Sequence, residues 1–225
     1  MIAAEIQRIT DALPAGVRLV AVSKYHPSDA IREAYAAGQR LFGESHAQEL
    51  QQKHAELADL ECLEWHFIGH LQTNKVKYIA PYVNLIHAVD SGRLLVEIDR
   101  QAAKAGRTVR CLLQLHVAAE ETKFGFTPDE ALTFLDRGDW RSLEHVQLSG
   151  VMAMASHTDD TGRIREDFRR ARAFFDRALR DYFSAVPQQF AELSMGMTDD
   201  WHIAVDEGST LIRIGTQIFG ERQYN

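Results

Sequence analysis

The 225-residue sequence predicts an α/β protein built as a single (β/α)8 TIM barrel. Short apolar, β-branched runs alternate with longer segments of helical periodicity. This order is typical of parallel strands, because a parallel neighbour requires a crossover connection. Eight such runs follow a leading amphipathic segment, at about 25 residues per unit. A doubly wound open sheet shows the same alternation, and periodicity alone does not separate the two folds.

The expected strands are short and rich in Val, Ile and Leu. They cover residues 19–22, 41–43, 66–69, 85–89, 111–117, 148–154, 191–195 and 211–214. No Gly-x-Gly-x-x-Gly fingerprint and no P-loop occurs, which disfavours an open nucleotide-binding sheet. In either fold, functional side chains are expected at the carboxyl ends of the strands.

The segments between the strands carry the start and stop signals of helices. The first dozen residues have isoleucines at helical spacing and predict an extra helix before the first strand. Ser28 and Ser91 are expected N-caps of helices that end near Gly38 and Gly106. The longest predicted helix covers residues 159–183. Shorter helices are expected at 46–58, 72–79, 128–137 and 199–207.

Composition excludes several classes of function. The net charge is -7, opposite in sign to that of most polyanion-binding proteins, so we expect no nucleic-acid partner. No apolar stretch approaches roughly 20 residues and no signal peptide opens the sequence, so we expect a cytoplasmic protein that does not bind a membrane. Two cysteines, Cys62 and Cys111, are too few for a disulfide framework or a cysteine zinc site.

Lys24 is the first candidate for chemistry. It directly follows the apolar run Leu19-Val20-Ala21-Val22 and falls at the carboxyl end of the first expected strand. Loss of hydration there lowers the pKa of an amine, and a neutral amine attacks an aldehyde to form a Schiff base. The alternative is a strand-end lysine whose ammonium reaches solvent.

Two loops of small and hydroxyl residues are candidate phosphate sites. One follows the eighth expected strand at Gly215-Thr216, and the other follows the seventh at residues 194–198. Phosphate sites of barrels favour the loops after these two strands. Arg213 lies among aliphatic residues of the eighth strand and therefore needs either a carboxylate partner or a ligand.

Other polar residues carry weaker signals. His66 and His70 lie on a strand and its end, where their spacing does not bring them onto one metal. His157 falls in a polar loop after the sixth strand, for which a solvated loop is the simpler interpretation. Glu44 is expected either as a carboxylate at the barrel mouth or as a first-turn acid of the next helix.

Together these stretches resemble the pyridoxal phosphate homeostasis proteins of the YggS/PROSC type. The similarity runs through residues 21–24, 42–44, 65–75, 123–126, 150–154, 193–200, 208–210 and 213–220. The strings H-F-I-G-x-L-Q-x-N-K and R-I-G-T-x-I-F-G are its most specific parts. The sequence departs from the family pattern at Ser45, where the family has asparagine, and at residues 155–157.

The resemblance implies one domain, residues 1–225, with the barrel of the alanine racemase N-terminal domain and an extra N-terminal helix. It implies pyridoxal 5′-phosphate (PLP) held as an aldimine on Lys24, with Arg213 facing the pyridine nitrogen. The residues expected at the cofactor are Lys24, Asn74, Ser194, Gly196, Met197, Arg213, Gly215 and Thr216. Of these, Ser194, Gly196, Gly215 and Thr216 are the expected phosphate ligands, and no metal is expected.

The function implied is intracellular PLP (vitamin B6) homeostasis as a carrier or buffer without robust catalysis. Racemases of this fold have a second domain that covers the cofactor, and the sequence is expected to lack one. The alternatives are a small PLP-dependent amino-acid racemase and a cofactor-free Schiff-base aldolase that uses Lys24. We expect a monomer, with transient contacts to PLP-dependent apo-enzymes.

Overall fold

The computed structural model describes residues 1–119 and 124–221. Eight parallel strands form a closed barrel in the order of the sequence. They are β1 (Arg18–Val22), β2 (Leu41–Glu44), β3 (Glu64–Phe67), β4 (Leu85–Val89), β5 (Val109–Leu115), β6 (Val146–Ala153), β7 (Glu192–Ser194) and β8 (Leu211–Ile214). β8 pairs with β1, which excludes the open-sheet alternative and confirms the predicted barrel.

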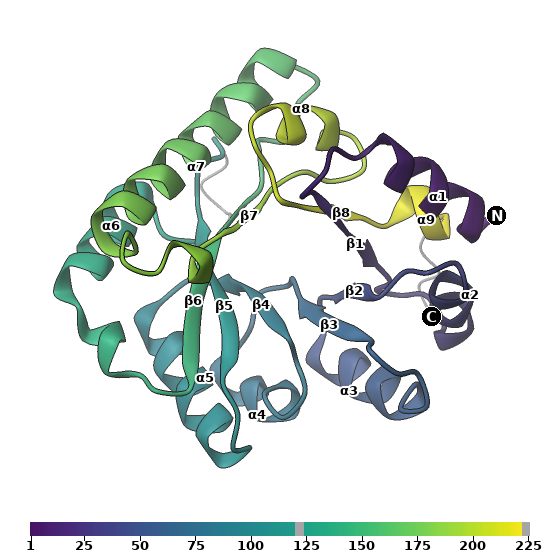
Figure 1. The fold of residues 1–225 in the computed structure, drawn as a ribbon, viewed down its shortest axis with the longest axis horizontal. Helices are drawn as coiled ribbons and strands as arrows, with labels where there is room; N and C mark the ends of the chain where they lie inside the picture. The colour runs from purple at the N-terminus through teal and green to yellow at the C-terminus, as the bar shows by residue number, and fades with distance from the viewer. Residues whose placement is uncertain (120–123, 222–225) are drawn as a thin grey trace.

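Helices form an outer ring around the strands (Figure 1). The α-helices are α1 (Ile2–Ala12), α2 (Ser28–Ala36), α3 (Ala47–Glu56), α4 (Val76–Ile79), α5 (Gly92–Lys104), α6 (Pro128–Arg137), α7 (Thr161–Tyr182), α8 (Trp201–Asp206) and α9 (Thr216–Phe219). Within the described part of the chain, the short 3-10 helices are η1 (Thr73–Lys75), η2 (Asp139–Ser142) and η3 (Pro187–Gln189). The predicted extra helix is α1, which packs against α2 and α9. None of the helices in the described residues could span a membrane.

Three local predictions differ from the structure. Pro27, not Ser28, is the N-cap of α2, because the Ser28 hydroxyl instead donates to the Glu56 carboxylate on α3. The third strand begins two residues earlier than expected and ends at Phe67, so that Gly69 lies in the following loop. α9 was not expected, since four residues are too few to show helical periodicity. The cap of α5 is confirmed, with the Ser91 hydroxyl accepting from the Leu94 amide.

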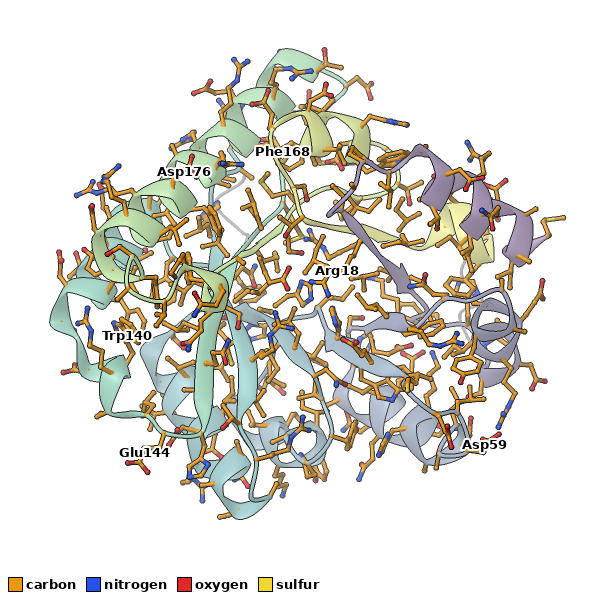
Figure 2. All side chains as sticks on the ribbon, in the orientation of Figure 1. Arg18, Asp59, Trp140, Glu144, Phe168 and Asp176 are labelled. Carbon is orange, nitrogen blue, oxygen red and sulfur yellow. The ribbon has the colours of Figure 1, made fainter. Side chains whose placement is uncertain are left out.

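The apolar core has two layers. The larger lies between the strands and the helix ring, and the smaller fills the barrel with residues such as Val20, Leu112 and Met152. At the amino ends of the strands, charged side chains close the barrel in place of apolar ones. There Glu192 pairs with Arg18 and Arg110, and Arg18 lies near the centre of the ring (Figure 2).

Gly150 occupies a position in the barrel wall that has no room for a side chain. Its φ is +145°, and a Cβ on it would lie 1.8 Å from the carbonyl oxygen of Glu192. The register between β5 and β6 shifts at this place, where Ser149 is the extra residue of a bulge. The close approach of β7 therefore requires glycine here.

Candidate functional site

A cavity of about 580 Å³ opens where the carboxyl ends of the strands meet. Its size is that of ordinary small-molecule sites, which range over about 300–1,000 Å³. Predicted site residues in its lining are Lys24, Met197, Arg213, Gly215 and Thr216. His26, Ser45, His70, His157 and Asp199 also line it.

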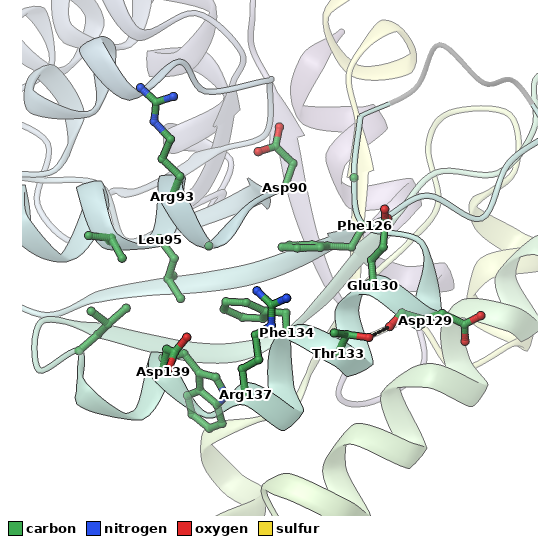
Figure 3. A pocket seen from close by; sticks show the side chains of 15 residues that line it. Asp90, Arg93, Leu95, Phe126, Asp129, Glu130, Thr133, Phe134, Arg137 and Asp139 are labelled. Carbon is green, nitrogen blue, oxygen red and sulfur yellow. Dashed lines mark hydrogen bonds between the residues drawn. The ribbon is translucent and has the colours of Figure 1, made fainter.

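A larger cavity of about 740 Å³ lies on the outside of the barrel, between α5 and α6 (Figure 3). It is a groove with aromatic side chains such as Phe134 and Trp140, and Arg93 and Arg137 also line it. It contains neither a lysine nor any of the predicted site residues. The smaller cavity is the better candidate because it combines an amine, a buried arginine and a small-residue loop at the functional end of a barrel.

The turn after β1 presents Lys24 to the cavity, and α3 holds that turn on both sides. Before Lys24, the carbonyl of Ser23 accepts a hydrogen bond of 2.8 Å from Lys53 Nζ. After it, the amide of Tyr25 donates to Glu49 Oε1 at 2.6 Å. Tyr25 has a φ of +64°, a left-handed conformation that is uncommon for a residue with a Cβ. The backbone around Lys24 is thus fixed by α3 and not by β1 alone.

Arg213 enters the cavity from β8, the strand beside β1. Its register partner on β1 is Val20, four residues before Lys24. Its guanidinium is buried and donates to two uncharged oxygens, Ser194 Oγ at 2.6 Å and the carbonyl of Ala153 at 3.1 Å. Burial lowers the pKa of Arg213 to about 10, which still leaves the group cationic at neutral pH. The arginine therefore brings a positive charge to the cavity wall.

The two small-residue loops differ in what they expose. Gly215 and Thr216 line the cavity after β8. Ser194, at the end of β7, is fully buried and bonds Arg213 instead of lining the cavity. Gly196 is also absent from the lining. Its φ is +91°, and a Cβ on it would lie 2.7 Å from the Ala204 Cβ on α8, so packing requires glycine.

Asn74 is not brought together with the other predicted residues. It lies in η1 and lines a separate hollow with Arg93 and Glu97, next to α5. Five of the eight predicted residues thus line one cavity, Ser194 lies behind one of them, and Gly196 lies in the loop beside it. Lys123, within one of the family-like stretches, lies outside the described residues.

The remaining candidates have structural partners. His66 is buried in the barrel, whereas His70 lies at the mouth, 3.0 Å from Asp90 Oδ2 and stacked on Phe124. No cluster of three or more potential metal ligands occurs within residues 1–119 and 124–221. Glu44 occupies neither expected position, since it is completely buried against α3 and paired with Lys53.

Comparison with known proteins identifies the family to which this chain belongs. The family described as alanine racemase, N-terminal domain, matches residues 1–223. A pyridoxal phosphate homeostasis protein of Aquifex aeolicus is 40% identical over 207 residues, which cover 92% of this chain and 88% of that protein. One from Mus musculus is 37% identical over 218 residues, covering 92% of this chain and 78% of that protein. This chain belongs to the pyridoxal phosphate homeostasis protein family.

Solved structures agree with this membership. PipY of Synechococcus elongatus, in the structure with PLP bound, superposes with a TM-score of 0.88 at 40% identity, covering 98% of this chain and all of that chain. Alanine racemase from E. faecalis is 18% identical, with a TM-score of 0.71 over 98% of this chain and 57% of its own. The racemase comparison shows a shared barrel only.

Sequence analysis missed two groups of polar residues in this member of the pyridoxal phosphate homeostasis protein family. One is the Glu44–Lys53 pair, and the other is His87 on β4, which is fully buried and contacts both His66 and Ser194. A signal for His87 was present, because a histidine within the apolar run Leu85-Ile86-His87-Ala88-Val89 is as unusual as Arg213 within its own run.

Proposed function

We propose that this chain binds PLP in the cavity at the carboxyl ends of the strands and serves as an intracellular carrier or buffer of that cofactor. The observation that carries the proposal is the meeting of Lys24, Arg213, Gly215 and Thr216 in one cavity, from the adjacent strands β1 and β8. The family relatives are named for PLP homeostasis, and PipY has been solved with PLP bound.

The residues present fit the chemistry of PLP. Lys24 would hold the cofactor covalently through its amine, with one water released from the aldehyde. Arg213, a cation at neutral pH, would face the pyridine nitrogen and keep it unprotonated, which weakens the ring as an electron sink. The Thr216 hydroxyl and the Gly215–Thr216 backbone amides would hold the phosphate.

A carrier is preferred to an enzyme because the relatives are named homeostasis proteins. The second candidate function, an amino-acid racemase, is favoured by the racemase-like barrel and by the histidines His26, His70 and His157 at the cavity. A racemase exchanges the α-proton of an amino acid with solvent, and a carrier does not.

The test is the visible absorption spectrum of the purified protein, followed by borohydride reduction and peptide mass mapping. We expect a yellow protein with the pyridoxyl-phosphate mass on Lys24. Lys24→Ala should be colourless and unlabelled, whereas Lys104→Ala, at an exposed position on α5, should behave as the parent does. A parent protein that stays colourless with excess PLP would refute cofactor binding.

The carrier and the racemase are separated by a second measurement. Amino acids are incubated with the PLP-loaded protein in D2O, and deuterium at the α-carbon is followed by NMR. We expect no incorporation above that of free PLP. Rapid incorporation that is lost in Lys24→Ala would establish the racemase instead.

The remaining parts of the proposal concern partners. We propose that the protein is a monomer, because a closed barrel leaves no sheet edge for pairing, and that it contacts apo-enzymes only transiently. Light scattering gives the mass in solution. Transfer of PLP to an apo-enzyme at a rate that depends on the concentration of that enzyme would support direct contact.

A further inference from the structure

A line of four hydrogen-bonded side chains crosses the inside of the barrel behind the cavity. Arg213 Nη1 lies 2.6 Å from Ser194 Oγ, which lies 2.9 Å from His87 Nδ1. His87 Nε2 in turn lies 3.0 Å from His66 Nδ1. The line passes through β8, β7, β4 and β3, and all four side chains are buried, with at most 4% of any residue exposed.

The surroundings of the two histidines in this line favour the neutral form of each ring. Burial lowers the pKa of His66, and it lowers the pKa of His87 still further, well below the ordinary value. Neighbouring positive charges add to the effect at His87, where Arg213 and Arg110 disfavour a second cation. Each ring therefore has one N–H donor and one acceptor nitrogen, so two opposite directions of hydrogen bonding remain.

The ends of the line select one direction. Arg213 has only donors, so the Ser194 oxygen accepts from it. If the Ser194 hydroxyl donates to His87 Nδ1, His87 Nε2 donates to His66 Nδ1, and the last hydrogen is on His66 Nε2. That nitrogen lies 3.9 Å from Glu64 Oε2 and has no hydrogen-bond partner within the described residues. An N–H toward a carboxylate is favourable there, whereas in the reverse direction a lone pair would face it.

We propose that His87 and His66 are positioning residues of the cofactor site, which turn the Ser194 hydroxyl so that its lone pair faces Arg213 and its hydrogen faces away. The guanidinium is thereby held at the cavity wall by an acceptor that cannot rotate. The role assigned to the site rests on the proposed PLP binding. The hydrogen-bond direction rests on the protein alone. Ser194 then acts through Arg213, which differs from the phosphate contact expected of it.

The direction is tested without cofactor, by 15N NMR of the histidine side chains in the PLP-free protein. We expect His66 and His87 to show the neutral form with the hydrogen on Nε2 from about pH 5 to 8, a range in which an ordinary histidine titrates. Ser194→Ala should change the Nδ1 shift of His87. A hydrogen on Nδ1 of His87, or titration of either ring near its ordinary pKa, would overturn the proposal.

The positioning role is tested with two variants of similar bulk. In His87→Asn the amide oxygen can take the place of Nδ1 as an acceptor, and in His87→Leu no acceptor remains. We expect His87→Leu to weaken PLP binding about tenfold, because the freed Ser194 hydroxyl can turn away from Arg213 and its hydrogen bond to that charged group is lost. The same variant should shift the pH dependence of the visible band. His87→Asn should stay within about threefold of the parent.

The outcomes separate this inference from the function on which it rests. A parent protein that takes up no PLP refutes the proposed function, while the tautomers in the PLP-free protein still decide the hydrogen-bond direction. Equal affinity of the parent and His87→Leu, or equal losses in His87→Leu and His87→Asn, would overturn the positioning role. Circular dichroism and urea unfolding establish that both variants are folded.

Discussion

Lys53 Nζ lies 2.7 Å from Glu44 Oε1, and the two side chains are 6% and 0% exposed. The same ammonium bonds the Ser23 carbonyl and Glu49, so one buried cation ties α3 to the end of β1, beside Lys24. Buried ion pairs contribute little net stability, but removal of one partner is costly because the other charge is left alone. The pair is therefore best understood as a fixed support for the Lys24 turn.

Loss of the cation should destabilise the protein. We expect Lys53→Met to lower the free energy of unfolding by about 3 kcal/mol, because Glu44 stays buried without its ammonium partner. Urea unfolding measures the change. The double variant Lys53→Met/Glu44→Gln should lose less than the sum of the single variants. Lys104→Met, at an exposed position on α5, is the control and should change stability by no more than about 0.5 kcal/mol.

Glu44 should also make stability depend on pH. Burial raises its pKa from 4.5 to about 7, despite the Lys53 ammonium. Between these values the folded state binds more protons than the unfolded state, so the free energy of unfolding falls as pH rises. The stabilisation is complete below pH 4.5 and lost as pH rises through about 7.

The measurement is urea unfolding at several pH values, for the parent and Glu44→Gln. We expect the parent to lose stability relative to this variant as pH rises from about 5 to 7.5, by at most about 1.4 kcal/mol per pH unit. Glu61→Gln, at an exposed position, should run parallel to the parent. If the free energy of unfolding of Glu44→Gln also ran parallel to that of the parent, Glu44 would have an ordinary pKa in the folded protein.

Gly150 should tolerate no side chain. We expect Gly150→Ala to lower the free energy of unfolding by more than about 4 kcal/mol or to prevent folding, since its Cβ would overlap the Glu192 carbonyl. Gly106→Ala is the matched control, because its φ is +64° and nothing lies within 4 Å of the added carbon. Its loss should be only about 1 kcal/mol. If both variants lost a similar free energy of unfolding, the β-bulge at Ser149 would have to shift to make room for the added Cβ.

Glu192 should respond to pH in the opposite sense to Glu44. Burial alone would raise its pKa, but hydrogen bonds from Arg18 and Arg110 outweigh this effect and the pKa lies below its ordinary value. Because both arginines are partly exposed and screened, we expect Glu192→Gln to lose only about 2 kcal/mol at pH 7. The stabilisation is present above the unfolded pKa and lost as pH falls through the folded one. If the parent and Glu192→Gln differed by a constant free energy of unfolding down to pH 3, the lowered pKa assigned to Glu192 would be contradicted.

The fold was predictable because each strand is a short apolar run and each long helix has an apolar face. Lys24, Arg213 and Thr216 were predictable for a related reason, since they stand at the ends of such runs or interrupt them. The Lys53–Glu44 pair was not predictable, because it depends on how α3 lies against β1 and β2. Local patterns carry no information on such angles between elements.

The position of Asn74 also shows what the sequence alone does not predict. The string that contains it is specific enough to indicate the family, yet the structure places its side chain in a hollow beside α5. Ser194 was predicted beside the phosphate because it is a hydroxyl at the end of β7, but the barrel turns it toward Arg213 and His87. Which face of a strand end meets the cavity is settled by the register of the closed sheet.

The closure of β8 onto β1 has a consequence for synthesis of the chain. Until residues 211–214 leave the ribosome, β1 and β7 both have unpaired edges, and such edges recruit other strands. Arg213 lies on that last strand, so the cavity at the carboxyl ends of the strands and the final pairing are completed together. A nascent chain stalled before β8 would therefore be prone to aggregation and would still lack a complete cavity.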